Sequence, residues 1–193
     1  MAALTVLVIR HGEKPGEAWP GQGSADDGTT DGHSLVIRGW QRAGSWAALF
    51  GPGLATALYP EPGKIFAANP SPPAGGANPD QSKRPFETIE PLAARLGLTP
   101  DTSFVLGQES ELVSEVLTLS GVVLVCWEHK AIAASVLPAM LAGQSIPGVP
   151  TKWDGTRFDV VLRFDRDAPG APWSFQPLYP CLLSGDTTQP MGS

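Results

Sequence analysis

The sequence has few cysteines, few basic residues and no long hydrophobic run, and each shortage excludes a class of protein. Two cysteines, Cys126 and Cys181, cannot form a disulfide framework, so a reducing, cytoplasmic location is expected. The 13 basic residues are outnumbered by 19 acidic ones and form no basic run, which argues against nucleic-acid binding. No apolar stretch approaches the ~20 residues of a membrane span. The first one, Leu4–Ile9, is too short for a signal peptide and has no basic leader.

The apolar residues that are present suffice for a globular core. Hydrophobic residues make up 42% of the chain and charged residues 17%, a balance that excludes a disordered protein. The length of 193 residues fits one domain, and the 22 glycines and 20 prolines lie mostly between the apolar segments. We therefore expect a single domain over residues 1–193, with long loops at about 14–34 and 69–80.

Hydrophobic periodicity predicts strands that alternate with helices. Leu4–Ile9 and Val122–Trp127 are continuous apolar runs, typical of strands that are buried on both faces. Helices are expected over 36–50, 86–96, 110–119 and 131–142, and further strands over 64–68, 103–106, 158–164 and 173–178. Pro91 should kink or interrupt the second helix, and the fourth contains Pro138. The alternation predicts an α/β fold, a three-layer α/β/α domain with a mostly parallel central sheet.

Polar residues follow the two strongest predicted strands directly. The first strand runs into the cluster RHGEK, residues 10–14, and the second is followed by His129. In open α/β sheets, sites form outside the carboxyl ends of the strands. A neutral, oriented imidazole attacks phosphorus, and neighbouring guanidinium groups neutralise phosphoryl oxygens and lower the histidine pKa. Arg10 and His11 therefore predict a histidine nucleophile in a phosphate pocket, which Gly12 lets the substrate approach closely.

Two later segments add candidate phosphate ligands. Arg84 stands at the start of a predicted helix in SKRPFETIEPLA, residues 82–93, where it would bind phosphate in a bidentate manner. A cation at a helix start opposes the helix dipole, which indicates another reason for its position. His129, in VVLVCWEHKAI, residues 122–132, would donate hydrogen bonds to the phosphoryl group.

The three segments together resemble the histidine phosphatase superfamily, the phosphoglycerate-mutase-like proteins. The shared features are Arg-His-Gly at the end of the first strand, an arginine at a later helix start and a histidine at a later strand end. The resemblance spans Leu4 to about Met140 and includes HSLVIRGWQRAGSWAALF, which is similar to the family's first helix. Glu13 and the stretch Trp127–Lys130 differ from the residues that many members carry at these positions. The chain therefore resembles a divergent small bacterial-type branch of the family.

The resemblance implies roles for individual residues. His11 is similar to the nucleophile that becomes phosphohistidine, and Arg10 and Arg84 are similar to the phosphate-binding arginines. His129 corresponds to the second histidine of the pocket. Lys14 occupies a position where some members carry another basic group near the phosphate. Thr88, four residues after Arg84, matches the family's Arg-x-x-x-Thr pattern and is expected to be structural. No cofactor and no metal are implied.

A carboxylic acid is also needed, to protonate the leaving oxygen and then to activate water. In the family this acid usually follows the third strand, where Glu109 and Glu111 lie. Glu109 is preferred because it is closer to the predicted strand end. Glu13 and Glu128 are further candidates, because each lies within two residues of a candidate histidine.

The leading hypothesis is a metal-independent phosphatase that acts on a phosphorylated small molecule or a phosphoprotein. A mutase would return the phosphoryl group to a second alcohol, but no extension or basic segment supports it. A non-catalytic phosphate or phosphoprotein sensor on the same fold is a further alternative, because a fold does not imply activity. A metallohydrolase that uses His11, His129 and acids would depend on metal, and no short-spaced ligand pair supports it.

Overall fold

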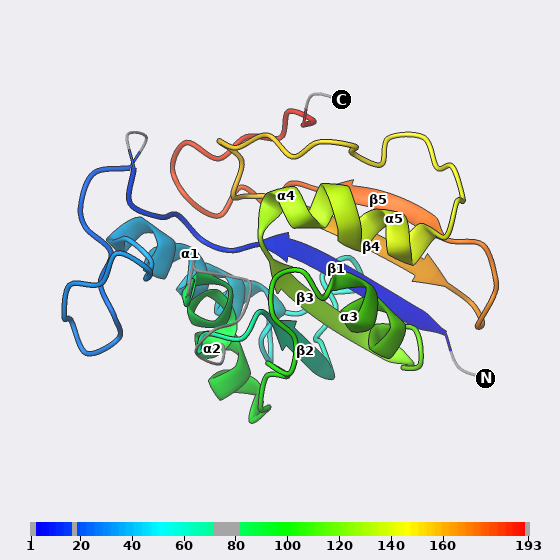
Figure 1. Ribbon diagram of the computed structural model, residues 1–193, viewed down its shortest axis with the longest axis horizontal. Coiled ribbons are helices and arrows are strands. Elements are labelled where there is room, and N and C mark those ends of the chain that lie inside the picture. The colour runs from blue at the N-terminus through cyan, green and yellow to red at the C-terminus, as the bar shows by residue number, and fades with distance from the viewer. Residues whose placement is uncertain (1–2, 17–18, 72–81, 192–193) are drawn as a thin grey trace.

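The computed structural model describes residues 3–16, 19–71 and 82–191. Its helices and strands follow the alternation that the sequence predicts, except that no strand separates the helices over 84–96 and 109–116 (Figure 1). In chain order they are β1 (Leu4–Arg10), α1 (Ile37–Phe50), β2 (Lys64–Ala67), α2 (Arg84–Leu96), α3 (Glu109–Val116), β3 (Gly121–Trp127), α4 (His129–Ala131), the π-helical turn η1 (Ile132–Val136), α5 (Leu137–Leu141), β4 (Val161–Arg166) and β5 (Ser174–Leu178). The two continuous apolar runs form β1 and β3, which pair with each other in the sheet.

The strands form one sheet in the order β2-β3-β1-β4-β5. β2, β3 and β1 run parallel to one another, whereas β4 is antiparallel to both β1 and β5. The sheet is therefore mixed, and the expectation of a mostly parallel sheet is wrong for the half that contains β4 and β5. The short connection over 167–173 explains the antiparallel pairing of β4 with β5, because a short loop joins antiparallel strands whereas parallel strands need a longer crossover.

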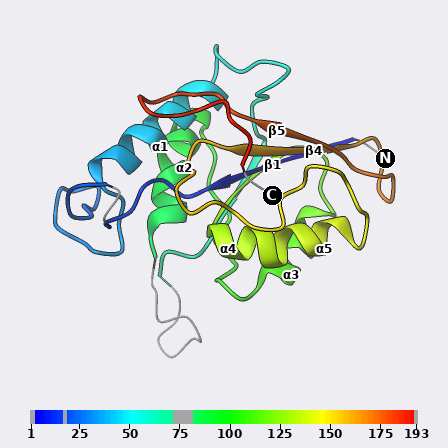
Figure 2. The ribbon, with the colours of Figure 1, turned by 90° about the horizontal axis from the view of Figure 1, so that it is seen from above.

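Helices cover both faces of the sheet, so β1 is buried on both sides. Leu7 and Ile9 pack in one apolar cluster, to which α1 and α2 contribute. Val6 and Val8 point to the opposite face and pack in a second cluster with α3, η1 and α5. Figure 2 shows α1 and α2 on one side of the sheet and α3, α4 and α5 on the other. This double burial explains why the strand sequence is continuously apolar rather than alternating.

The three parallel strands end at the same edge of the sheet. In the pairing register Arg10 lies opposite Trp127, and Ala67 lies opposite Cys126. The residues that follow β1, β2 and β3 are therefore brought together at one edge, although they are far apart in the sequence. This is the place where α/β sheets form their sites.

Some predicted elements differ from the observed ones. Residues 103–106 do not form a strand: only Asp101 makes an isolated bridge to Phe66, and Gln108 folds back to accept a hydrogen bond from the backbone of Val105 at 3.0 Å. Of the kink or break expected at Pro91, the break is wrong, because α2 is continuous through that residue. β4 begins at Val161, three residues later than the sequence predicts.

The predicted helix over 131–142 begins at His129 and contains the π-helical turn η1 just before Pro138. Proline removes an amide hydrogen and its ring clashes with the carbonyl of the preceding turn. A π-type turn changes the spacing of those carbonyls, so the segment continues in helical form through Pro138.

The two predicted loops differ in how much of them is described. Residues 14–34 are loop in the described part and contain an isolated bridge between Ser24 and Thr30. Of the loop at 69–80, positions 72–80 lie outside the described residues. Within the described ranges, every helix is too short or too polar to cross a bilayer. The cytoplasmic location stays a prediction.

Candidate active site

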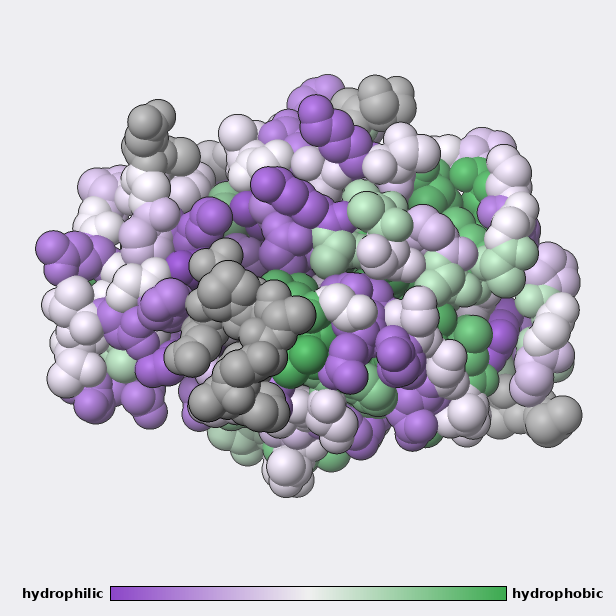
Figure 3. All heavy atoms as spheres, viewed as in Figure 1, coloured by the Kyte–Doolittle hydropathy of each residue, from purple (hydrophilic) through white to green (hydrophobic). Residues whose placement is uncertain are grey.

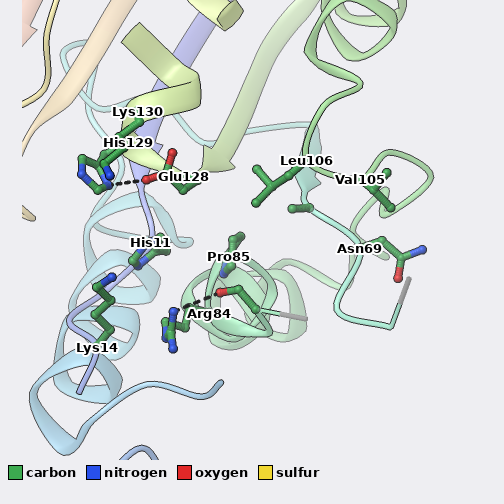
Figure 4. A pocket seen from close by; sticks show the side chains of 12 residues that line it. His11, Lys14, Asn69, Arg84, Pro85, Val105, Leu106, Glu128, His129 and Lys130 are labelled. Atoms are coloured by element: carbon green, nitrogen blue, oxygen red, sulfur yellow. Dashed lines mark hydrogen bonds and ion pairs between the residues drawn. The ribbon is translucent and has the colours of Figure 1, made fainter. Parts of the chain in front are cut away.

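A cavity of about 320 Å³ opens at the edge of the sheet where β1, β2 and β3 end. Its walls come from the residues after each of these strands, from the start of α2 and from the turn before α3 (Figure 4). They are His11, Lys14, Ala68, Asn69, Ser82, Arg84, Pro85, Val105, Leu106, Glu128, His129 and Lys130. Figure 3 shows hydrophilic side chains gathered on this face over the start of α4. We call this space the phosphate cavity, after the ligand that the sequence analysis predicts for it.

His11 follows β1 directly and is held in one tautomer. Its backbone N–H donates to the carbonyl of Trp127 at 3.2 Å, which extends the pairing of β1 with β3 by one residue. The imidazole Nδ1 lies 2.7 Å from the carbonyl oxygen of Gly12. A carbonyl only accepts hydrogen bonds, so Nδ1 carries the proton and Nε2 keeps its lone pair.

The surroundings of His11 keep its ring neutral. The side chain is 3% exposed, and burial lowers the pKa of His11 from 6.5 to about 3. The positive charges of Arg10, Arg84 and His129 act in the same direction, while the bond to the Gly12 carbonyl opposes them. At neutral pH the imidazole is therefore an uncharged base with a free nitrogen, as a nucleophile must be.

Close backbone packing fixes the turn that follows His11. A Cβ atom on Gly12 would lie 2.9 Å from the carbonyl oxygen of Gly39 in α1, so the loop can pass only without a side chain there. The hydroxyl of Thr88 accepts a hydrogen bond from the Gly12 N–H at 2.7 Å. The same hydroxyl donates to the Arg84 carbonyl at 2.6 Å. Thr88 thereby ties the His11 turn to the first residue of α2 and has the structural role that the sequence predicts.

Arg84 and Lys14 bring positive charge to the phosphate cavity. The Arg84 guanidinium donates to the carbonyl of Gly32 at 2.6 Å and to that of Ser34 at 3.3 Å, so the 32–34 loop orients it. Lys14 lines the same cavity. Partial burial lowers the pKa of Lys14, and the charges of Arg84 and Arg10 lower it further. The like charges of Lys14, Arg84 and Arg10 therefore raise the positive potential around the cavity.

Glu128 and His129 form a close pair at the start of α4. Glu128 Oε2 accepts a hydrogen bond from the N–H of Ala131 at 2.8 Å, as the N-cap of the helix. Glu128 Oε1 lies 2.6 Å from Nδ1 of His129 (Figure 4). Burial alone would raise the pKa of Glu128, but these bonds from His129 and Ala131 outweigh it and lower the pKa to about 2. The pair therefore presents a carboxylate that holds His129 in place.

Arg10 is not among the residues that line the phosphate cavity. Its guanidinium donates to the carbonyls of Gly155 at 2.7 Å and Arg157 at 3.2 Å, and it lies 3.7 Å from the ring centre of Phe158. Burial lowers the pKa of Arg10 to about 10, against the opposing effect of Glu128 and other carboxylates. Arg10 thus stays charged at neutral pH and acts on His11 through its field.

The candidate acids occupy four different environments, and among them only Glu128 lines the phosphate cavity. Glu109 is buried and accepts hydrogen bonds from the indole of Trp127 at 2.9 Å and the backbone of Gly107 at 3.0 Å. Glu13 is fully buried and accepts from Arg42 at 2.7 Å. Glu111 is exposed on α3.

The structure thus brings together His11, Lys14, Arg84 and His129, and leaves Arg10 and Glu109 outside the cavity lining. Lys130 is a lining residue to which the sequence analysis gave no role, and its position directly after His129 is the signal that could have identified it. Within the described residues, no cluster of three histidine, cysteine or carboxylate side chains is placed to hold a metal ion.

The fold and site define an α/β protein with a histidine-bearing cationic cavity at the carboxyl ends of its parallel strands. No family model matches the sequence, and no curated protein matches it. Among solved structures, the fold is similar to that of a mycobacterial glucosyl-3-phosphoglycerate phosphatase, with a TM-score of 0.56. The match has 15% sequence identity and covers 90% of this chain and 97% of that one. It shows a phosphoglycerate-mutase-like fold.

Proposed function

We propose that the chain is a phosphatase of the histidine phosphatase superfamily, which hydrolyses phosphomonoesters through a phosphohistidine on His11. The observation that carries this proposal is a neutral histidine, with Nδ1 held 2.7 Å from a backbone carbonyl, inside a cavity lined by Lys14, Arg84 and His129. The likeness in fold to a phosphatase supports it. The substrate is a phosphorylated small molecule or a phosphoprotein.

In the first step, His11 Nε2 attacks phosphorus in line with the ester oxygen. A bond forms between Nε2 and phosphorus, and the bond between phosphorus and the ester oxygen breaks with its electron pair on oxygen. Lys14 and Arg84 donate hydrogen bonds to the non-bridging oxygens and stabilise the charge that builds up in the transition state, while the N–H of His129 faces the leaving oxygen. The buried charge of Arg10 adds to this field. The cationic side chains thereby neutralise the charge on the phosphoryl oxygens, a role that a metal ion has in other phosphatases.

The leaving oxygen takes its proton from the pair of His129 and Glu128. The sequence favours Glu109 for this role, but the Glu109 carboxylate faces Trp127 and Gly107, whereas Glu128 lines the cavity. With Glu128 ionised, His129 carries the proton and gives it to the leaving alkoxide. The pair, which now consists of a neutral His129 and the Glu128 carboxylate, then removes a proton from water, which attacks phosphorus and breaks the bond to Nε2. Inorganic phosphate leaves, and His11 and the pair return to their starting states.

The test is hydrolysis of p-nitrophenyl phosphate in the presence of EDTA. The native chain should be active, and His11→Ala should lower the rate by about 10³-fold or more, as removal of a nucleophile does. His33→Ala is the matched control, because His33 is an exposed loop residue outside the cavity, and it should keep the native rate. Activity that EDTA abolishes, or that survives in His11→Ala, would contradict the proposal.

The role of the acid is tested by comparing Glu128→Gln with Glu109→Gln on two leaving groups. Phenol leaves less readily than p-nitrophenol and needs the proton more. Glu128→Gln should therefore slow phenyl phosphate by about 10²-fold or more and p-nitrophenyl phosphate much less. Glu109→Gln should slow both equally, if at all. The reverse result would assign the proton transfer to Glu109.

A further inference from the structure

A second cavity adjoins the phosphate cavity and shares two of its residues. This space, which we call the side cavity, has a volume of about 440 Å³. It is lined by His129, Lys130, Ala133, Ala134, Thr151, Lys152, Trp153 and Gly155. His129 and Lys130 line both spaces, so a molecule whose phosphoryl group contacts His129 has the side cavity directly beside it. Each volume alone is in the range of small-molecule sites.

The lysines of the chain divide into two groups by their partners. Lys64 pairs with Asp101 at 2.8 Å, and Lys83 pairs with Asp31 at 2.7 Å. Lys14, Lys130 and Lys152 form no ion pair within the part of the chain that the structure describes, and all of them line the phosphate cavity or the side cavity. In a chain with a net charge of −6, the lysines without a carboxylate partner are thus collected at these two spaces.

The floor of the side cavity is apolar. Ala133 and Ala134 of the helical segment contribute only methyl groups. The indole N–H of Trp153 is already donated to the carbonyl of Arg157 at 2.9 Å, so its ring offers the cavity an apolar surface. The neighbouring carboxylate of Asp154 accepts hydrogen bonds from the backbone and hydroxyl of Thr156 at 2.8 and 2.7 Å. Besides His129, the ionisable side chains that line the space are Lys130 and Lys152.

The wall that carries Lys152 is anchored to the catalytic region. Arg10 donates to the carbonyl of Gly155 at 2.7 Å, and Gly155 lines the side cavity. Trp153 is 3% exposed, which fixes the loop from inside. The side cavity is therefore a formed space beside the phosphate cavity with its apolar contacts in place, and the two lysines that line it are exposed.

We propose that the side cavity holds the leaving group of the substrate, and that this group has an apolar body with a second acidic function. The apolar body would lie on Ala133, Ala134 and Trp153, and Lys130 and Lys152 would bind the acid. This inference rests on the phosphatase function proposed above and adds the class of substrate: a phosphomonoester of an alcohol or phenol that also bears a carboxylate or a further phosphate.

The test compares pairs of aryl phosphates that differ in one charge. 4-Carboxyphenyl phosphate is paired with its neutral amide, 4-carbamoylphenyl phosphate, and the same pair is made with a biphenyl body to allow for a longer reach. The measured quantity is the ratio of kcat/KM for the acid to that for the amide. The native chain should prefer the acid of at least one pair. Lys152→Ala should lower that ratio about threefold to fivefold, as loss of an exposed ion pair does, and Lys152→Glu should lower it further.

Lys64→Ala is the matched control, because it removes the same charge at the start of β2, outside both cavities. Its ratio should equal that of the native chain. The inference is overturned if the native chain shows no preference in either pair, or if Lys152→Ala and Lys64→Ala change the acid-to-amide ratio equally. The side cavity then does not bind the acidic group, although the phosphatase function stands.

If no aryl phosphate is hydrolysed, the proposed function fails. The role of the side cavity is then tested separately, by measuring ligand binding. Isothermal titration with the corresponding phosphonates should then show tighter binding of the acid than of the amide, and Lys152→Ala should remove the difference. Equal affinities for acid and amide in the native chain would overturn the inference.

Discussion

Replacing Thr88 with valine tests whether the His11 turn is held by α2. Valine has nearly the shape of threonine but no hydroxyl, so the change removes hydrogen bonds and leaves the packing. The Gly12 N–H donates to the hydroxyl of Thr88 at 2.7 Å, and Thr88 is fully buried. In the valine variant this N–H is left without an acceptor. An unsatisfied buried donor costs about 1–3 kcal/mol, and the lost bond to the Arg84 carbonyl costs about 1 kcal/mol more at most.

The expected result is a decrease of about 2–3 kcal/mol in the free energy of unfolding, measured by urea denaturation. Thr118→Val is the matched control. Thr118 is exposed, and its hydroxyl also donates to a backbone carbonyl, that of Glu115 at 2.7 Å. Loss of this exposed bond should change stability by about 0.5 kcal/mol or less.

The same substitution should also slow catalysis, because Thr88 joins the nucleophile's turn to Arg84. Displacement of reacting groups by about 1 Å costs up to about 10²-fold. In conditions where the variant is fully folded, kcat should fall by about tenfold or more, and Thr88→Ser, which keeps the hydroxyl, should restore most of it. A Thr88→Val chain with native stability and native kcat would refute the reasoning.

Two further predictions concern buried charge. The pKa of His11 is 6.5 unfolded and about 3 folded, so the unfolded chain binds more protons between these values. The free energy of unfolding should therefore decrease as the pH falls from 6.5 toward 3, and His11→Asn should make this decrease less steep in urea denaturation curves at a series of pH values. Glu13→Gln removes the Glu13 carboxylate that pairs with the buried Arg42 at 2.7 Å and leaves Asp186 at 2.8 Å in place, so it should cost about 1.5–3 kcal/mol of unfolding free energy. Lys64→Met, which breaks an exposed pair, should cost about 1 kcal/mol or less; equal losses in the two variants would contradict the burial argument.

The strands at the centre of the sheet could be predicted because their sequences are continuous runs of apolar, largely β-branched residues. Leu4–Ile9 and Val122–Trp127 lie inside β1 and β3. Their pairing places the residues after each strand at one edge, which is why His11 and His129 could be expected to meet there. The segment 103–106 has similar composition, but the Phe104 carbonyl accepts a hydrogen bond from the backbone of Asn69, and the side chain of Gln108 accepts one from the backbone of Val105. The contact with Asn69 is long-range and leaves no trace in a local pattern.

Arg10 shows why adjacency in sequence does not give adjacency in the site. Successive residues of a strand point to opposite faces, so Arg10 and His11 diverge. Arg10 meets the carbonyls of Gly155 and Arg157, which come from more than 140 positions further along the chain. No local signal predicts that contact.

The choice of acid depends on tertiary contacts in the same way. Glu109 was favoured by its position after a predicted strand, but the indole of Trp127 and the backbone of Gly107 hold its carboxylate. Glu128 lines the phosphate cavity because it caps α4 beside His129. Lys152 carried no signal at all, since a single lysine in a loop is an ordinary surface residue.

The central claim is that the phosphoryl group passes through His11, and a rapid chemical quench tests it most directly. The native chain is mixed with a radiolabelled phosphomonoester, quenched in base, and digested to locate the label. The expected result is a base-stable, acid-labile phosphoenzyme that forms and decays within the turnover time, with the label on the peptide that contains His11. Turnover without any labelled enzyme, or with the label on a residue other than His11, would contradict the phosphohistidine mechanism.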